Sequence, residues 1–213
     1  MEERIKVAVR IRPENIEHMN IYQSKINKNE IIINSESINN KSDEHSFKFD
    51  NIYNNNTTQN DIFNDIKDLI YSSINGYNTT IFAFGMTGSG KTHTISGTKS
   101  DPGIVPRSIE LIFKEIDNRK LNNSKEVCIP YLSCIELYNN ILYDLLETPT
   151  SSTNSNTNSN AGGNTNTFIG NYKPTSLKLY EHPIKGVTVT GTNTIRTPVT
   201  SVKETMDLIQ MAN

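Results

Sequence analysis

Apolar and polar residues alternate at the start of the chain. Between Ile5 and Ile11 every second residue is apolar, which predicts a strand with one polar or site-facing side that ends before Pro13. Residues 30–49 repeat this period of two on both sides of a polar tip. They are therefore expected to form short strands joined by turns.

The period changes to a helical one in three later segments. Apolar residues stand three to four positions apart, which predicts amphipathic helices, in residues 61–74, 104–119 and 201–211. Thr57 and Thr58 precede the first segment as capping residues. Gly76 follows it, where a helix commonly stops.

Two further segments are apolar without a clear alternation. Residues 79–84 predict a short buried strand directly before a glycine-rich loop and a further helix. Residues 127–138 are apolar at both parities, as expected of a strand buried on both faces. Pro130 removes one ladder donor, so we expect a bulge or a late strand start near it. Two short strands are also expected in residues 177–189, around a turn that contains His182 and Lys185.

One long segment lacks the composition of a folded core. Asparagine occurs 29 times in the 213 residues, and only 34% of the chain is hydrophobic. Residues 148–176 hold much of this excess as Asn, Ser and Thr. Such a segment buries too little surface to offset its ordering entropy, so we interpret it as a disordered surface insert. Expansion of the coding sequence is the simplest explanation, and a partner site is the alternative.

Composition also excludes several classes of protein. No apolar run approaches the roughly 20 residues that span a bilayer, and no secretory leader is apparent, so we expect no membrane partner. The net charge of -2 does not indicate a nucleic-acid binder. Cys128 and Cys134 would lie too far apart on a strand to form a disulfide, and reduced thiols fit an intracellular setting.

The glycine-rich loop carries the clearest chemistry. Its sequence fits Gly-x4-Gly-Lys-Ser/Thr between an expected strand and an expected helix, the context of a P-loop: Gly85, Met86, Thr87, Gly88, Ser89, Gly90, Lys91 and Thr92. Such a loop turns its backbone N–H groups towards a polyphosphate. Lys91 supplies a mobile cation, and the Thr92 hydroxyl is placed to bind Mg²⁺. The loop alone leaves open GTPases, small-molecule kinases, ring ATPases and motors.

The wider sequence resembles the kinesin motor domain. Residues 76–94 look like the P-loop block of that family, and other blocks follow in the family's order. They are Val9-Arg10-Ile11-Arg12-Pro13, Phe47-Lys48-Phe49-Asp50, Gly103-Ile104-Val105-Pro106-Arg107, Ser133-Cys134-Ile135-Glu136-Leu137-Tyr138-Asn139-Asn140 and Gly186-Val187-Thr188-Val189. The resemblance identifies residues 1–213 as the amino-terminal portion of a kinesin motor domain.

The resemblance implies a fold and a set of ligands. The fold is α/β, a P-loop NTPase fold of the kinesin type with a mixed central sheet and helices on both faces, incomplete in this chain. The ligands are ATP with Mg²⁺, and the partner is a microtubule. A homodimer would form through regions outside these residues, and the location would be the cytoskeleton.

The resemblance also assigns roles to residues beyond the loop. Arg10, Arg12 and Pro13 would lie beside the adenine, and His93 would stack on it; from its position alone, His93 is equally a helix-surface residue. His182 and Lys185 would be tubulin contacts, with a plain hairpin turn as the alternative.

Some features depart from the family pattern. Met86 replaces the usual Gln, Asn140 the usual Glu, and Cys134 a common aromatic residue. The loop before Gly103 is short, unlike that of the bipolar mitotic kinesins, so no subfamily is assigned.

The switch motifs of kinesins, which position the attacking water, do not occur in these residues. We therefore expect this portion alone to be inactive. A non-motor nucleotide-binding or tubulin-binding relative, and an unrelated P-loop kinase or GTPase, remain as alternatives.

Overall fold

The computed structural model describes most of the chain in several stretches. These are residues 5–13, 22–27, 29–36, 42–123, 125, 127–147, 176–184, 186–191 and 196–212. The chain divides into two compact units, residues 1–112 and 113–213, and each is described by itself. Within the described residues, no helix is long and apolar enough to cross a membrane.

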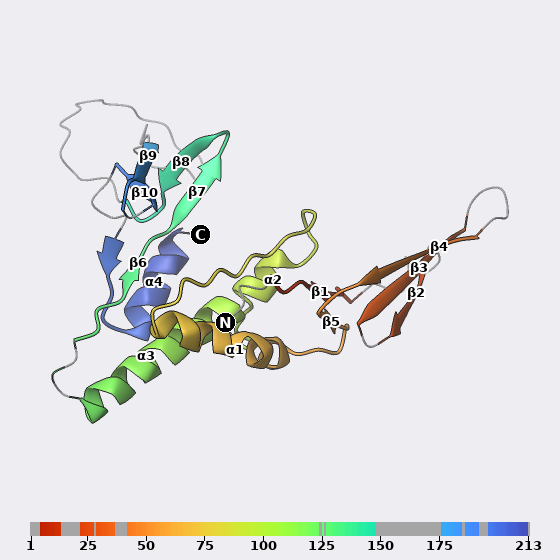
Figure 1. Cartoon of the computed structure of the whole chain (residues 1–213), viewed down its shortest axis with the longest axis horizontal. Coiled ribbons are helices and arrows are strands. Elements are labelled where there is room, and N and C mark those ends of the chain that lie inside the picture. Colours follow the sequence, from red (N-terminus) through yellow and green to blue (C-terminus); the bar gives the residue numbers. More distant parts are fainter. Residues whose placement is uncertain are drawn as a thin grey trace, which may run out of the picture. The chain divides into compact units, whose positions relative to one another are not determined.

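The first unit contains two small sheets. Strand β1 (Ala8–Arg10) pairs in parallel with β5 (Asn51–Tyr53). Strands β2 (Tyr22–Asn27), β3 (Glu30–Glu36) and β4 (Ser42–Lys48) form an antiparallel sheet in that order. In Figure 1 this sheet extends away from helices α1 and α2, with β1 and β5 in between. The alternation in residues 5–11 and 30–49 thus predicted strands correctly, whereas β2 was not predicted.

Helix α1 (Gln59–Ile74) follows from its capping residues and its apolar stripe. The Thr58 hydroxyl accepts a hydrogen bond from the Asp61 amide at 3.1 Å, and the Asp61 carboxylate accepts one from the Thr58 amide at 3.0 Å, a capping box. The helix ends at Ile74 with Asn75 as its C-cap, and Gly76 follows with a φ of 96°. The predicted helix, its cap at Thr58 and its end at Ile74 are confirmed, and it begins two residues before the predicted start at Asp61.

The core of the first unit lies between α1 and its neighbours. Ile62 on α1 packs with Tyr53 of β5 and Ile104 of α3 (Ile104–Asn122), and all three are buried. Ile81 and Ile95 cover this cluster. Ile95 ends the short helix α2 (Lys91–Ile95), which begins within the P-loop sequence as predicted. This packing brings the end of β1, the start of α1 and helix α2 into one unit.

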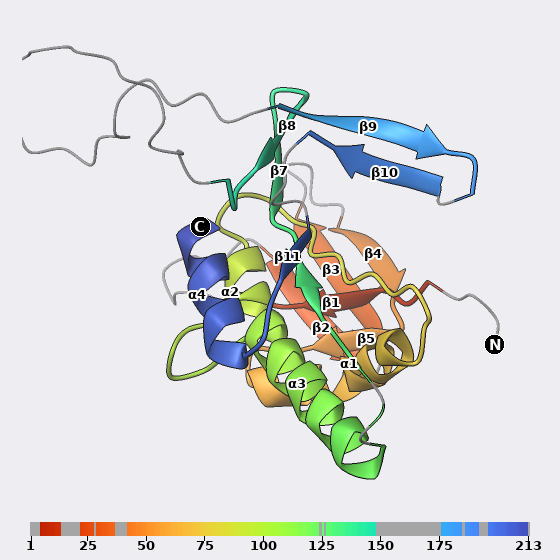
Figure 2. The ribbon, with the colours of Figure 1, turned by 90° about the vertical axis from the view of Figure 1, so that its left-hand side faces the viewer.

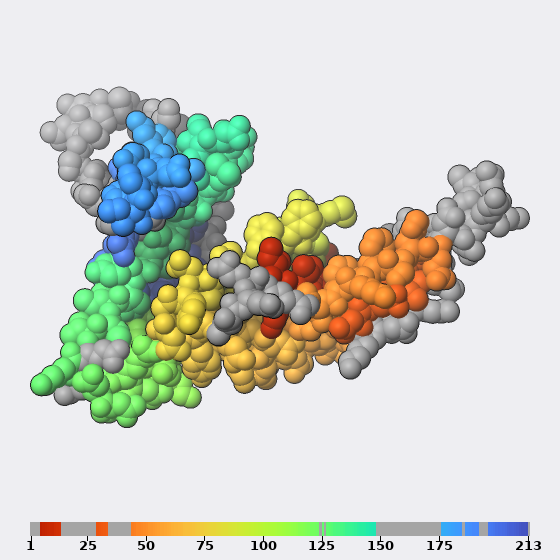
Figure 3. All heavy atoms as spheres, viewed as in Figure 1, coloured from red at the N-terminus to blue at the C-terminus, as the bar shows by residue number. Residues whose placement is uncertain are grey.

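The predicted buried strand at residues 79–84 is wrong for this structure. The segment belongs to no strand, and Phe82 and Phe84 are 80% and 90% exposed. Figure 3 shows the yellow atoms of this region projecting from the surface. The physical reason is that no strand of the described residues pairs with it, and strand hydrogen bonds require a neighbour.

The second unit holds a four-stranded antiparallel sheet in the order β10–β9–β8–β7. Its strands are β7 (Ile135–Tyr138), β8 (Ile141–Asp144), β9 (Ser176–His182) and β10 (Gly186–Thr190). Figure 2 shows β9 and β10 as a hairpin. Strand β6 (Tyr131–Leu132) pairs with β11 (Thr197–Pro198), and helix α4 (Val202–Ala212) closes the described chain. The expected hairpin and final helix are confirmed.

The expectation of one strand buried on both faces in residues 127–138 is also wrong for this structure. They form two short strands rather than one, and several of their side chains are exposed, Val127 to 79% and Leu137 to 66%. A strand buried on both faces needs cover on both sides, and the described residues do not provide it. The late start after Pro130 is confirmed, because β6 begins at Tyr131.

The strands of the described residues thus form four separate sheets rather than one central sheet. Helices and strands occur together, and parallel and antiparallel pairs both occur, so the mixed α/β class is confirmed. The predicted mixed central sheet with helices on both faces is not formed by the described residues, because their strands pair only within these separate sheets. Residues 148–175 of the predicted insert lie outside the described residues, and its last residue, Ser176, belongs instead to β9.

Candidate functional site

The P-loop forms a compact turn at the start of α2. Gly88 and Gly90 have φ angles of 79° and 102°, a region that side chains with a Cβ rarely adopt. The Ser89 amide donates to the Met86 carbonyl at 3.1 Å, which closes the turn. Gly90 then serves as the N-cap of α2. Gly90, which the sequence pattern requires, and Gly88, which it does not, are therefore positions where the backbone turns sharply.

Lys91 lies back over its own loop. Its Nζ donates to the carbonyl oxygens of Gly85 and Met86, both at 2.8 Å. Two carbonyl acceptors keep the ammonium group above the loop rather than out in solution. The cation thus already lies beside the loop that would bind an anion.

The end of β1 reaches the P-loop through Arg12. Its guanidinium group donates a hydrogen bond to the Gly88 carbonyl. Residues 76 positions apart in sequence are joined by this contact. Arg12 and the P-loop, which the sequence analysis placed at one site, are therefore neighbours in the structure.

Arg10 makes a different set of contacts. Its guanidinium group donates to Gln59 Oε1 at 2.9 Å and to Thr94 Oγ1 at 3.1 Å. Burial lowers the pKa of Arg10 from its ordinary value, and the charge of Asp101 acts in the opposite direction. Arginine remains charged in either case, so a partly buried cation lies beside the site.

A cavity of about 870 Å³ connects these groups within the first unit. A volume of this size is within the usual range for small-molecule sites. The predicted residues that line it are Arg10, Arg12, Pro13, Gly85, Ser89, Gly90, Lys91 and His93. Met86, Thr87, Gly88 and Thr92 are not among its lining residues. The structure therefore brings eight of the twelve expected nucleotide residues to one cavity.

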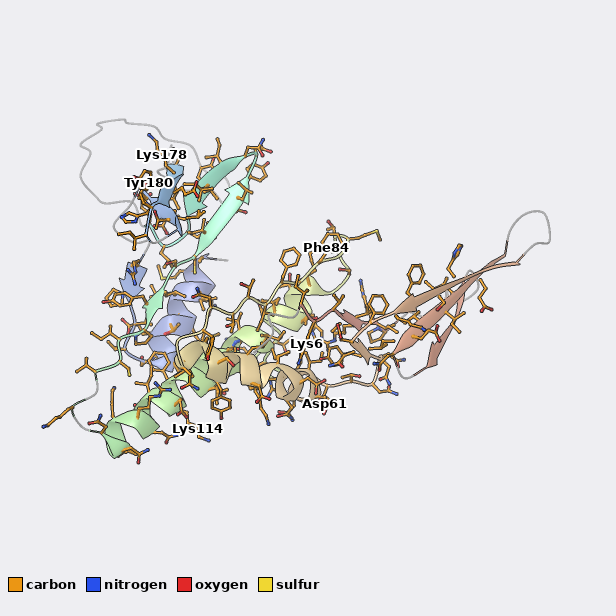
Figure 4. The ribbon with its side chains drawn as sticks, in the orientation of Figure 1. Lys6, Asp61, Phe84, Lys114, Lys178 and Tyr180 are labelled. Atoms are coloured by element: carbon orange, nitrogen blue, oxygen red, sulfur yellow. The ribbon has the colours of Figure 1, made fainter. Side chains whose placement is uncertain are left out.

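The cavity wall has both signs of charge. Lys6, Arg10, Arg12 and Lys91 supply cations, and Asp50, Asp65, Asp68 and Asp101 supply carboxylates. Figure 4 labels Lys6 near β1 and Phe84 on the segment just ahead of α2. The cations Arg12 and Lys91 gather at the P-loop, so this end of the cavity suits an anion.

Sequence reasoning missed two residues at the site. Gln59 is 2% exposed and joins Arg10 to the backbone of α2. Thr94 accepts from Arg10 and donates its hydroxyl to the Gly90 carbonyl at 3.2 Å. Gln59 follows a capping residue, where a polar side chain is ordinarily exposed, so the pattern gave no signal. Thr94 stood inside the P-loop block without an assigned role.

The residues expected to contact tubulin lie in the second unit. His182 ends β9, and its Nδ1 accepts a hydrogen bond from the Ile184 amide at 3.1 Å, which shapes the turn to β10. Figure 4 labels Lys178 and Tyr180 on the same strand. Lys185 lies outside the described residues. The described geometry is that of a hairpin turn.

The described residues contain no group of three or more His, Cys, Asp or Glu side chains that could hold a metal ion. A P-loop hydroxyl together with phosphate oxygens and water needs no such cluster to bind Mg²⁺. Thr92 is exposed at the start of α2. Its donor chemistry therefore fits a magnesium ion that arrives with a nucleotide.

The glycine-rich loop, the helix behind it and the mixed α/β fold are typical of P-loop proteins. A sequence model of the kinesin motor domain matches residues 10–213. The chain therefore belongs to the kinesin motor domain family, and the family resemblance of its motifs is confirmed.

Individual relatives agree with this assignment. The chain is 32% identical over 176 residues to the kinesin-like protein KIN-8B of Arabidopsis thaliana, covering 83% of this chain and 18% of that protein. It is 40% identical over 173 residues to the kinesin-like protein KIF27 of Mus musculus, covering 76% and 12%. The chain thus spans less than a fifth of the length of these relatives.

A solved structure shows the same fold. It is the KIF14 dimer in a two-heads-bound state with AMP-PNP, in complex with a microtubule. The match has a TM-score of 0.74 and 26% identity, and covers 100% of this chain and 54% of that one.

Proposed function

We propose that this chain provides the P-loop portion of an ATP-dependent microtubule motor, which couples ATP binding and hydrolysis to movement along microtubules or to their remodelling. Membership of the kinesin family supports this function. The observation that carries it is the contact of Arg12 with the Gly88 carbonyl. This contact joins the residues expected to bind the base to those expected to bind the phosphates. Members of both groups line one cavity.

The P-loop would hold the phosphates. A polyphosphate would replace the carbonyl groups of Gly85 and Met86 as the acceptor for Lys91 Nζ, a charge-assisted hydrogen bond being the stronger one. The residues of the loop with their backbone N–H groups would complete the cradle. Bound Mg²⁺ supplies positive charge to the outer phosphates, and the Thr92 hydroxyl would be its protein ligand.

The end of β1 would hold the base. Arg10, Arg12 and Pro13 line the cavity together with His93 at α2. A planar guanidinium group and an imidazole ring both suit the face or edge of a purine. Because Arg12 also contacts the P-loop, the base and the phosphates would be bound by one connected set of residues.

The microtubule is the proposed partner. The KIF14 motor to which this chain is similar was solved in complex with a microtubule. In this chain the turn with His182 and Lys185 is the proposed tubulin contact in the second unit. Such a partner would place the protein at the cytoskeleton, and a homodimer would depend on regions outside these residues.

Steady-state hydrolysis by the complete natural protein tests this function. We expect turnover of Mg-ATP that rises when microtubules are added, and a preference for ATP over GTP. Binding of ATP without hydrolysis would indicate a non-motor relative. A preference for GTP, with no response to microtubules, would contradict the proposal and favour an unrelated P-loop enzyme.

A further inference from the structure

Gln59 is a buried polar side chain at the start of α1. It is 2% exposed, although it directly follows the capping residue Thr58. Burying an amide group costs free energy unless its donor and acceptor are both hydrogen-bonded. The structure meets this condition with groups that line the proposed nucleotide cavity.

Both ends of the Gln59 amide are used. Its Oε1 accepts from the Arg10 guanidinium at 2.9 Å, and its Nε2 donates to the His93 carbonyl at 2.5 Å. Arg10 itself reaches Thr94 Oγ1 at 3.1 Å. Gln59 thereby links the end of β1 to helix α2 through α1, and its two partners are residues proposed to hold the base.

The P-loop has its own hydrogen bonds, which do not involve Gln59. Lys91 Nζ is bound to the carbonyl groups of Gly85 and Met86. The amide of Ser89 donates to the Met86 carbonyl at 3.1 Å. Loss of Gln59 would therefore leave the loop's internal structure in place.

We propose that Gln59 is a positioning residue for the base-binding side of the nucleotide site, acting through Arg10 and the backbone of His93. This inference rests on the proposed function. It predicts a selective defect: a ligand with a base loses affinity, and a bare polyphosphate does not. A residue needed only for general stability would affect both ligands.

The test uses two substitutions in the complete natural protein. Gln59→Met keeps similar volume and removes both hydrogen bonds. Gln59→Glu keeps the acceptor for Arg10 and removes the donor to His93, and it gives a second route should the first variant fold poorly. Asn64→Met is the matched control, because Asn64 is exposed on the same helix and, among the described residues, its side chain accepts one hydrogen bond, from Lys67 at 3.5 Å.

Calorimetric titration with Mg-ADP and with Mg-tripolyphosphate measures the two sides of the site. For Gln59→Met we expect the Kd of ADP to rise about tenfold and that of tripolyphosphate by less than about twofold. Gln59→Glu should show the same selectivity, and Asn64→Met should bind both ligands normally. Equal losses for both ligands, or none for ADP, would overturn the inference.

A second measurement needs no ligand. The amides of Thr94 and Ser96 are bonded within α2, and the Gln59 link holds this helix. In the nucleotide-free protein, Gln59→Met should speed hydrogen exchange at these amides and leave the middle of α1 unchanged. Unchanged exchange in α2 would also overturn the inference.

Failure of the proposed function has a different signature. If the unaltered protein bound neither ADP nor tripolyphosphate, the proposed function would fall and this inference with it. Normal binding by the unaltered protein, with unselective losses in the Gln59 variants, would remove only the inference.

Discussion

Two apolar segments lead to the proposed nucleotide site, and only one of them is a strand. Residues 8–10 form β1, which pairs with β5 at three positions. Residues 79–84 have an equally apolar sequence and stand directly before the P-loop, yet belong to no strand. The difference lies in the neighbours, because a strand exists only where another strand accepts its hydrogen bonds.

The side chains of residues 79–84 show the same contrast. Ile81 packs on the core cluster of Tyr53, Ile62 and Ile104, whereas Phe82 is 80% exposed. One face of the segment is thus covered within the first unit and the other is not. Phe82 and Phe84 stack with their ring centroids 6.4 Å apart, and an exposed apolar patch ordinarily marks a contact with further protein.

The largest expected effect concerns residues 1–213 expressed alone. Exposed apolar side chains and unpaired backbone groups each reduce the stability of a domain that has only about 5–15 kcal/mol in total. We expect this piece to aggregate or to be partly unfolded, without microtubule-stimulated hydrolysis. Thermal melts of residues 1–213 and of the complete natural protein make the comparison. A cooperative melt with stimulated hydrolysis from residues 1–213 would show that no further cover is needed.

The next effect compares the buried core, on which Ile81 packs, with the exposed face of the segment. In the complete natural protein, Ile62→Ala should cost about 2–5 kcal/mol of unfolding free energy, because Ile62 is 2% exposed in the core. If further protein covers residues 79–84, Phe82→Ala should cost a similar amount. Urea denaturation measures both substitutions.

Ile184→Ala is the control for that comparison, since Ile184 is 90% exposed on a turn, and it should change stability by less than about 0.5 kcal/mol. A cost for Phe82→Ala as small as that of the control would mean that this face stays in solvent.

A smaller effect is expected at the cap of α1. Thr58→Ala should cost about 1 kcal/mol at neutral pH, the usual value for a lost N-cap. Hydrogen bonds from the Thr58 hydroxyl and amide lower the pKa of Asp61 below its ordinary value. The lowered pKa means that the ionised carboxylate stabilises the fold above about pH 4, the ordinary Asp range.

That contribution is lost as the pH falls through the lowered pKa. The difference between Thr58→Ala and the unaltered protein should therefore shrink in acid. Denaturation at pH 7 and at pH 3 measures it, and an equal difference at the two values would contradict the capping box.

Local features of the fold could be predicted from the sequence. The capping residue Thr58, the period of α1 and the stop at Gly76 are set by neighbours in the chain, and the structure has all of them. The absence of a strand at residues 79–84 could not be predicted, because a strand depends on a partner strand and not on its own residues alone. The same reason accounts for the exposed side chains in residues 127–138.

The candidate site divides along the same line. The P-loop is a continuous motif, so its position follows from the sequence alone. The end of β1 was assigned to the site only through the family resemblance. In the structure, Arg12 donates a hydrogen bond to the Gly88 carbonyl. Gln59 was missed because its burial depends on Arg10 and His93, and no local pattern records two such distant partners.

The central claim is that Lys91 and its loop hold the phosphates of ATP for hydrolysis. Microtubule-stimulated turnover of Mg-ATP by the complete natural protein, unaltered and as Lys91→Ala, tests it most directly. Loss of the charge-assisted contact should cost about 2–3 kcal/mol, a fall in turnover of at least roughly 30-fold. Unchanged turnover in Lys91→Ala would contradict the assignment of this site.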